Sequence, residues 1–468
     1  MNILLVKAVQ QNPYYEEITH PIGLMVIASM IREHTNHDVR ILDLRLFRKP
    51  YQEFESILNT FKPDIIGISA ISLEVESMTR LSHIAKNFNK GITIISGGPH
   101  TTLYPDETLA NEDIDYGVIG EGEETIIELL SYLSNPDKNI NEIRGIVYRK
   151  EGKIIKTDNR PWIENLDKLP LPAWDLVELE KYKNFKGGSV FGGRKFATLI
   201  TSRGCPLNCI YCTHILGKRF RGMSPERVFS EIKYIKHNFE IDEFEILDDI
   251  FNFDRKRVEK ICDLIIRNNL NIKLYIAQLR VDLLDPALLN MFKKAGVVFI
   301  GFSIESASKR IQKLVKRNLN LEKTNKAISC AYKLNIFTLG FFILGFPTET
   351  EEEIMETIDF AARSALTTAS FFLLVPFKGT ELWKDYLKNS TRVEKTDFRE
   401  FNFYTGKYNM SAVSDAKLLK LRNLAYRKFY LKPKRIFTII RLYHNKRFLL
   451  KLGIGTFRRM FSKFLFLR

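Results

Sequence analysis

The first 130 residues alternate short β-branched runs with stretches whose apolar residues recur at helical spacing. Stretches such as Gly23 to His34 and Val75 to Asn87 predict helices between the strands. The predicted strands are Asn2 to Val6, Val39 to Leu44, Asp64 to Ser69, Thr93 to Ser96 and Tyr116 to Ile119. This alternation predicts an α/β domain in which helices cover both faces of a parallel sheet.

A second strand–helix series follows after a connecting region. Gly145 to Thr157, interrupted at Glu151-Gly152, predicts a β-hairpin, and the proline-marked segment Asn159 to Trp174 predicts a linker. Six such units suit a partial six-stranded parallel barrel better than another flat sheet, although the pattern alone leaves both open. The six strands are expected at Ala197 to Thr201, Glu243 to Leu247, Lys273 to Ala277, Val298 to Ile304, Phe337 to Leu344 and Ser370 to Leu374.

Length and composition place the chain among folded multidomain proteins. A chain of 468 residues with 45% hydrophobic content is expected to form two or three domains. The apolar run at the start is too short for a signal peptide, and no stretch approaches the roughly 20 apolar residues of a membrane-spanning helix. We therefore expect a cytoplasmic protein.

The net charge of +16 is concentrated at one end of the chain. No Asp or Glu follows Asp415, whereas 16 Lys and Arg lie between Lys417 and Arg468. The surplus of positive charge therefore belongs to the C-terminal region, and the rest of the chain is neutral.

Three of the five cysteines lie within eight positions, which indicates a metal site and not a disulfide framework. Cys205, Cys209 and Cys212 form a C-x3-C-x2-C pattern directly after the first predicted barrel strand. Three thiolates can hold a 4Fe–4S cluster and leave its fourth iron without a protein ligand. The alternative is a zinc site with His214 as fourth ligand, but structural zinc usually has paired ligands.

The other two cysteines follow a different pattern. Cys262 and Cys330 fall on the apolar faces of predicted helices, and we expect both to be buried packing residues.

The cysteine pattern, with an aromatic residue before its last cysteine, resembles the radical S-adenosylmethionine (SAM) superfamily. The resemblance spans roughly Ala197 to Tyr386 and includes polar or glycine-bearing segments at successive strand ends. It implies that the open iron binds SAM, and that an electron from the cluster releases a 5′-deoxyadenosyl radical. It further implies SAM contacts from Tyr211, Asp248, Asp249, Glu305 and Gly345.

Two charged residues at strand ends are the strongest catalytic candidates. Glu305 directly follows an apolar strand, and Arg280 is a candidate partner for a carboxylate. The ordinary interpretation of both is an internal ion pair.

Glycines and small polar residues follow three strands of the N-terminal domain, where a ligand can approach the backbone closely. These segments, with Pro21-Ile22-Gly23-Leu24, resemble the cobalamin-binding domain of one large radical SAM class, over roughly residues 1 to 135. The resemblance implies that cobalamin is bound by Ser69, Ser72, Gly97, Gly98, Gly120, Glu121 and Gly122.

The N-terminal domain departs from other cobalamin domains because it has no Asp-x-His-x-x-Gly motif, and hence no lower-ligand histidine. We expect His100 to be a loop residue and not a cobalt ligand. RNA methylthiotransferases, the competing class, need an upstream cysteine cluster, and Cys205 is the first cysteine of this chain.

These observations predict an α/β fold. A Rossmann-like, flavodoxin-type cobalamin-binding domain (residues 1–135) precedes a β-hairpin and linker (136–190), a partial (β/α)6 radical SAM barrel (191–390) and a helical basic C-terminal region (391–468). The implied cofactors are a 4Fe–4S cluster, SAM and cobalamin. The implied reaction methylates an unactivated carbon or functionalises it in another way, such as ring formation. The rival hypothesis is a cobalamin-fold sensor or accessory protein without radical chemistry.

The basic C-terminal region predicts a partner. Two apolar stripes lie beside basic residues: Ile436, Ile439, Ile440 and Tyr443, and then Phe457, Met460, Phe461, Phe464 and Leu465. This arrangement is typical of helices that lie in an anionic membrane surface, here its inner face. Packing on the barrel is the alternative, and nucleic acid is disfavoured because the aromatics follow helical spacing. We expect a small hydrophobic substrate, such as a lipid, and a reducing electron donor such as ferredoxin or flavodoxin.

Overall fold

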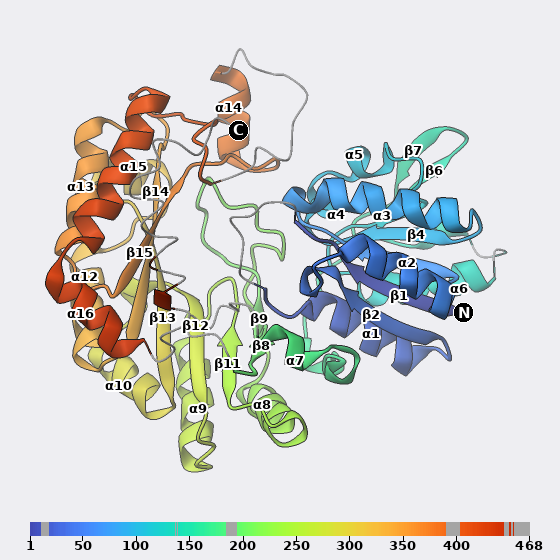
Figure 1. Cartoon of the computed structure of the whole chain (residues 1–468), viewed down its shortest axis with the longest axis horizontal. Coiled ribbons are helices and arrows are strands. Elements are labelled where there is room, and N and C mark those ends of the chain that lie inside the picture. The colour runs from blue at the N-terminus through green and yellow to red at the C-terminus, as the bar shows by residue number, and fades with distance from the viewer. Residues whose placement is uncertain are drawn as a thin grey trace. The chain divides into compact units, whose positions relative to one another are not determined.

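The computed structural model describes residues 1–10, 18–135, 137, 139–183, 194–389, 403–443, 449–450 and 453. The described residues form two compact units (Figure 1). The first contains residues Met1–Tyr182 and the short segment His214–Gly222, and the second contains Lys183–Thr213 and the described residues from Met223 onward.

A seven-stranded sheet forms the centre of the first unit, in the order β2-β1-β3-β4-β5-β6-β7. The first five strands are parallel and have the flavodoxin-type order, which confirms the predicted fold class. The predicted hairpin forms β6 and β7, which extend the same sheet antiparallel to β5. The strands are β1 (Asn2–Lys7), β2 (Asp38–Asp43), β3 (Ile65–Ser69), β4 (Thr93–Gly97), β5 (Tyr116–Val118), β6 (Ile146–Lys150) and β7 (Lys153–Lys156).

Helices cover both faces of this sheet, because its strands carry apolar side chains in both directions. On one face, α1 (Ile22–His34) and α6 (Glu123–Ser134) pack against β1 and β5. On the other face lie α2 (Pro50–Phe61) and α3 (Val75–Phe88). The shorter elements are η1 (Leu44–Leu46), η2 (Ser72–Glu74), α4 (Pro99–Leu103), α5 (Pro105–Leu109), η3 (Ile140–Glu142), η4 (Leu166–Lys168), η5 (Trp174–Leu176), α7 (Leu179–Tyr182) and β10 (Arg221–Gly222).

The second unit is built on six parallel strands in the order β15-β14-β13-β12-β11-β8, the open series that the sequence predicted. Gly301 of β13 allows close approach to β12, since a Cβ there would lie 2.1 Å from the carbonyl oxygen of Ala277. The strands are β8 (Ala197–Leu199), β11 (Glu243–Ile246), β12 (Lys273–Leu279), β13 (Val297–Glu305), β14 (Phe337–Leu344) and β15 (Thr368–Leu373), and β9 (Ser202–Arg203) is a further short strand.

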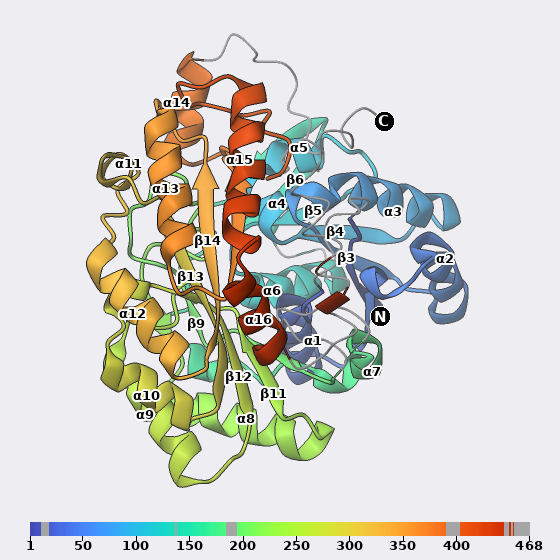
Figure 2. The ribbon, with the colours of Figure 1, turned by 60° about the vertical axis from the view of Figure 1, so that its left-hand side comes forward.

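Helices lie along the outside of this curved sheet, and α13 and α15 run side by side next to β14 and β15 (Figure 2). Phe342 and Phe371 face these helices, and Phe371 packs edge-on against Tyr426 and Phe429 of α15. The helices are α8 (Pro225–Phe239), α9 (Arg255–Arg267), η6 (Val281–Leu283), α10 (Pro286–Lys294), α11 (Lys309–Leu314), α12 (Leu321–Lys333), α13 (Glu351–Arg363), α14 (Glu381–Asn389), α15 (Asp415–Tyr430) and α16 (Pro433–Leu442).

The described part of the C-terminal region is docked on the second unit. Arg435 is buried on α16 and donates hydrogen bonds to carbonyls at the end of α13, and Lys428 pairs with Asp359. The stripe predicted around Ile436 is therefore not one exposed face. Ile439 and Tyr443 are buried, and the Tyr443 ring lies 6.0 Å from Phe337, because α16 lies against the barrel strands. The stripe from Phe457 to Leu465 lies outside the described residues.

The turn after β14 is fixed by a buried carboxyl group. Glu349 is fully buried, and its Oε2 accepts hydrogen bonds from the backbone N–H groups of Gly345 (2.7 Å) and Phe346 (3.1 Å). Its Oε1 has no hydrogen-bond partner among the described residues. Burial raises the pKa of Glu349 to about 8, and the two N–H groups oppose this shift only in part.

Glu349 should therefore make stability fall as pH rises. Its folded pKa lies above its unfolded value of 4.5, so the folded state holds a proton that the unfolded state releases between these values. We expect the free energy of unfolding to fall by about 3–5 kcal/mol between pH 5 and pH 9 from this group alone. Glu349→Gln keeps an acceptor for the two N–H groups and removes the titration. Urea unfolding at both pH values should show a flatter profile for the variant, whereas parallel profiles would contradict the assignment.

Candidate functional site

Two aspartates at the carboxyl end of β11 hold the start of the cysteine loop. Asp248 is buried and accepts three hydrogen bonds of 2.6 Å each, from the Thr201 N–H, the Thr201 hydroxyl and the Ser202 hydroxyl. Asp249 accepts a hydrogen bond of 2.9 Å from the N–H of Gly204, the residue before Cys205. These aspartates therefore fix the path of the chain from β8 into the loop.

The middle of the loop is tied to two other segments of the second unit. The N–H of Ile210 donates to the carbonyl of Val315 at 3.2 Å, and the carbonyl of Ile210 accepts from the N–H of Leu382 at 3.0 Å. Cys209 is buried, Cys205 is half-buried and Cys212 is exposed. The three thiols therefore span a range from the interior of the unit to its surface.

A buried charged group lies beside Cys209. Arg317 places its Nη1 3.9 Å from the Cys209 sulfur and donates through Nη2 to the Ser303 carbonyl. Glu305 and Tyr211 interact electrostatically with Arg317. Burial raises the pKa of Glu305, and Arg317 opposes this shift. The Tyr211 hydroxyl is buried and lies near Glu305, but it has no hydrogen-bond partner among the described residues.

The backbone at Glu305 is unusual. Its φ of 68° lies in the left-handed region that non-glycine residues seldom adopt, and the register between β13 and β14 shifts between Ser303 and Glu305. Such local strain is found preferentially at functional sites. The structure thus brings Tyr211, Glu305 and Cys209 together, and it adds Arg317, which the sequence pattern did not indicate.

The thiol arrangement fits a cluster better than a single metal ion. Among the described residues, no three His, Cys, Asp or Glu side chains converge as ligands of one ion. The three thiolates of a cubane bind different iron atoms, so they need not converge in this way. The guanidinium of Arg317 also compensates negative charge on a Cys209 thiolate.

Other predicted residues take structural positions. Arg280 forms a two-pronged ion pair with Asp282, with Nε 2.8 Å from Oδ1, which favours the ion-pair interpretation. Gly345 adopts a φ of 99° in the turn that Glu349 holds. Cys262 is buried as predicted, and this burial raises the pKa of its thiol to about 12. Cys330 is only partly buried.

In the first unit, three loops meet at the carboxyl edge of β3, β4 and β5. Ser69 and Gly97 are register partners, and a Cβ on Gly98, with φ of 87°, would lie 2.9 Å from the Ser69 hydroxyl. The N–H of Gly120 donates a hydrogen bond to the hydroxyl of Thr102 on α4 at 3.1 Å. Around Gly97 and Gly120, the nearest atom to an added Cβ is 3.9 Å away, so both backbones are open to a ligand. This edge fits a large cofactor such as cobalamin.

Not every predicted residue at this edge is open to a ligand. The Glu121 side chain is buried in an ion pair with Arg221. His100 is buried, stacks on Tyr104 and places Nδ1 3.3 Å from the Ser72 hydroxyl. His100 therefore has a structural role, but it lies on the short helix α4 and not in a loop as predicted.

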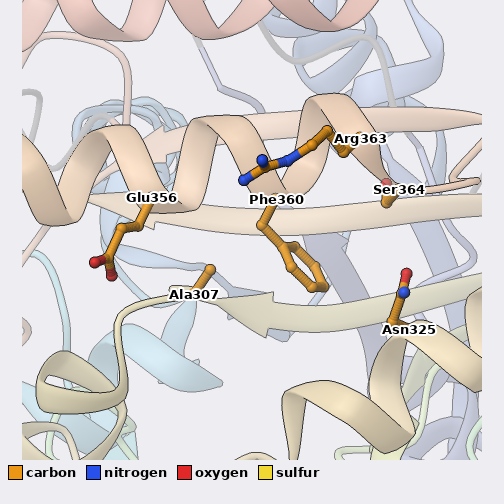
Figure 3. Close-up of a pocket in the computed structure, with 6 residues that line it drawn as sticks. All are labelled: Ala307, Asn325, Glu356, Phe360, Arg363 and Ser364. Carbon is orange, nitrogen blue, oxygen red and sulfur yellow. The ribbon is translucent and has the colours of Figure 1, made fainter.

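A cavity of about 420 Å³ lies on the helical side of the second unit (Figure 3). It is bordered by α12 and α13 and contains none of the predicted site residues. Its lining consists of Ala307, Asn325, Glu356, Phe360, Arg363 and Ser364.

Comparison with family models agrees with this division. Residues 14–130 match the B12 binding domain, and residues 199–361 match the radical SAM superfamily. An uncharacterized methyltransferase of Pyrococcus horikoshii is 34% identical over 94% of both chains. An anaerobic magnesium-protoporphyrin IX monomethyl ester cyclase of Rubrivivax gelatinosus is 27% identical, over 88% of this chain and 74% of that protein.

Solved structures share the fold. The cobalamin-dependent SAM radical enzyme OxsB, with aqua-cobalamin and SAM bound, has a TM-score of 0.74 and 17% identity, over 97% of this chain and 72% of its own. The radical SAM methyltransferase TsrM from Kitasatospora setae has a TM-score of 0.69 and 17% identity, over 84% of this chain and 77% of its own.

The fold, the cysteine loop and the two family matches lead to one assignment and confirm the predicted fold class and enzyme class. The chain belongs to the radical SAM enzymes that carry an N-terminal B12-binding domain.

Proposed function

We propose that this enzyme cleaves SAM at a 4Fe–4S cluster on Cys205, Cys209 and Cys212 and functionalises an unactivated carbon of its substrate with the help of cobalamin. The observation that carries the proposal is the buried group of Glu305, Arg317 and Tyr211 beside Cys209. Charged groups are costly to bury unless they serve a partner or a ligand.

Each residue of this group has a distinct role in the proposal. When bound, the cluster supplies the electron for SAM cleavage and cobalamin supplies the methyl group. Arg317 balances the thiolate charge and offers a cation to the methionyl carboxylate, and Glu305 accepts the methionyl ammonium group. Tyr211, whose ring centre lies 5.8 Å from that of Phe346, provides an apolar surface for the adenine together with the turn at Gly345.

The two aspartates act less directly. Asp248 accepts its three hydrogen bonds from Thr201 and Ser202, so we assign it to holding the loop and not to SAM. Asp249 holds Gly204 in the same way. In the first unit, the open backbones at Gly97 and Gly120 support cobalamin binding, and Gly98, Ser69 and Ser72 lie at the same edge.

A hydrophobic substrate is supported by the inner face of β14. Leu339, Phe341 and Ile343 alternate with fully buried residues and are each partly exposed, so this face offers an apolar wall. Phe341 is the register partner of Ser303, whose carbonyl binds Arg317. The wall therefore lies one strand away from the charged group. The relatives include a methyltransferase and a ring-forming cyclase, and both outcomes fit this site.

The accessory-protein hypothesis is tested by the reaction itself. Anaerobically reconstituted protein with dithionite and SAM should release 5′-deoxyadenosine. The variants Cys205→Ala, Cys209→Ala and Cys212→Ala should each lose the cluster, and their 5′-deoxyadenosine release should fall to background. Cys262→Ala and Cys330→Ala are matched controls and should retain both iron and product. Liquid chromatography with mass spectrometry measures the 5′-deoxyadenosine, and iron and sulfide counts measure the cluster content. A wild-type protein with an intact cluster but no product would support the accessory protein, and equal loss in all five variants would refute the ligand assignment.

A membrane contact through the C-terminal region is the second part of the proposal. Phe437 is 68% exposed and Leu431 57%, and Ile436 and Ile440 are exposed on the same side of α16. Lys434 and Arg427 are exposed nearby, and no acidic residue follows Asp415. An apolar surface with a basic rim is complementary to an anionic membrane. Among the helices that the structure describes, none is long and apolar enough to span a bilayer.

Flotation with vesicles of phosphatidylcholine and phosphatidylglycerol tests this contact. We expect salt-sensitive binding that Phe437→Asp weakens about tenfold or more, since burial of a Phe side chain contributes about 1.5–3 kcal/mol. Phe253→Asp is the matched control, because Phe253 is 43% exposed and lies outside this region. Removal of the whole region is unsuitable, because Tyr426 and Phe429 belong to the core. Equal binding of both variants, or binding without anionic lipid, would contradict the proposal.

A further inference from the structure

A buried ion pair joins two distant segments within the first unit. Arg221 Nη1 lies 2.9 Å from both carboxylate oxygens of Glu121, and both side chains are only 2% exposed. The N–H of Ile163 donates to Glu121 at 2.7 Å, and Arg221 donates to the carbonyls of Ile163 and Leu216. The carboxylate and the guanidinium are thus satisfied by several partners at once.

Trp162 packs near Gly217 and Gly120, which lie in the two segments that the ion pair joins. A Cβ on Gly217 would lie 3.0 Å from the indole, and a Cβ on Gly120 would lie 3.9 Å from it. Both glycines have positive φ, 89° and 78° respectively, so side chains are disfavoured at both places. The guanidinium of Arg221 lies 5.2 Å from the centre of the Trp162 ring. The close fit is therefore at Gly217, and Arg221 lies next to the Trp162 ring.

The two residues of this ion pair lie in, or shortly after, predicted cofactor-binding loops. Glu121 lies between Gly120 and Gly122, in the loop assigned to cobalamin, and Gly122 precedes α6. Arg221 lies in the segment His214–Gly222, which folds with the first unit although it follows Cys212 after a single residue, Thr213. One end of the ion pair is therefore in the cobalamin loop, and the other is on the chain that leaves the cysteine loop.

Burial of an ion pair is costly, and an apolar pair of similar size would often be as stable. A nearby pair shows the contrast, since Arg219 and Glu164 join the same segment to the linker but are 75% and 60% exposed. An exposed pair of this kind holds its segments only weakly.

We propose that Glu121 and Arg221 are positioning residues that couple cobalamin binding to the cysteine loop, so that cobalamin changes the affinity of the loop's site for SAM. This inference rests on the proposed function. Cobalamin binding orders the Gly120–Gly122 loop, the ion pair transmits this order to residues 214–222, and the chain carries it to Cys212. Coupling of this kind is reciprocal, so a SAM analogue should also tighten cobalamin binding.

The test measures the Kd of S-adenosylhomocysteine for the reconstituted full-length protein, with and without hydroxocobalamin. We expect a change of about fivefold or more in the wild type. Glu121→Gln and Arg221→Lys should reduce the ratio of the two Kd values to near one. Glu121→Gln removes the negative charge, and Arg221→Lys lacks the second nitrogen that binds the Leu216 carbonyl. Hydrogen–deuterium exchange in residues 205–222 should fall when hydroxocobalamin binds to the wild type, and this fall should be lost in both variants.

The exposed pair provides the controls. Glu164→Gln in the linker and Arg219→Lys in the segment His214–Gly222 make the same chemical changes, and both should keep the wild-type coupling. Retention of hydroxocobalamin after gel filtration distinguishes a failure of the coupling from a failure of the cobalamin assignment. A wild type that retains hydroxocobalamin but shows no coupling, or variants that couple as the wild type does, would overturn this inference alone. A wild type that does not retain hydroxocobalamin would overturn the cobalamin assignment as well.

Discussion

The proposed active centre depends on the carboxyl end of β11, where Asp248 and Asp249 hold the chain between β8 and Cys205. Asp248 gathers three short hydrogen bonds from Thr201 and Ser202 in a buried position, and Asp249 fixes the Gly204 N–H. A loop that must offer three thiolates to one cluster needs such a fixed origin, because small displacements of ligands weaken metal sites. The rest of the loop then adapts to the Val315 and Leu382 backbones.

Burial of charge marks the functional regions in both units. Arg317 and Glu305 lie beside Cys209, and Glu121, in the glycine-bearing loop of the first unit, pairs with Arg221. Elsewhere, ion pairs such as Arg219 with Glu164 lie in solvent and contribute little. Each unit thus has buried charged groups at the loops that follow its strands, in addition to buried charges elsewhere, such as Arg435 of α16.

Strand–helix alternation was enough to predict both parallel sheets, because side-chain periodicity records which faces are buried. The cysteine spacing and the glycines at strand ends were equally visible. Arg317 was not, because its role depends on a contact with Cys209 from more than 100 positions away in the sequence. For the same reason the pattern did not distinguish Asp248, which serves the loop, from Glu305. The stripe on α16 was misassigned in part because periodicity alone does not reveal that Ile439 and Tyr443 face the barrel while Ile436 and Phe437 face outward.

The central claim is that three cysteines leave one iron of a 4Fe–4S cluster free for SAM. Electron paramagnetic resonance of the dithionite-reduced, reconstituted protein tests it most directly, with spectra recorded before and after addition of SAM. The account predicts a 4Fe–4S signal whose g-values change when SAM binds the open iron. A cluster signal that SAM leaves unchanged would contradict it.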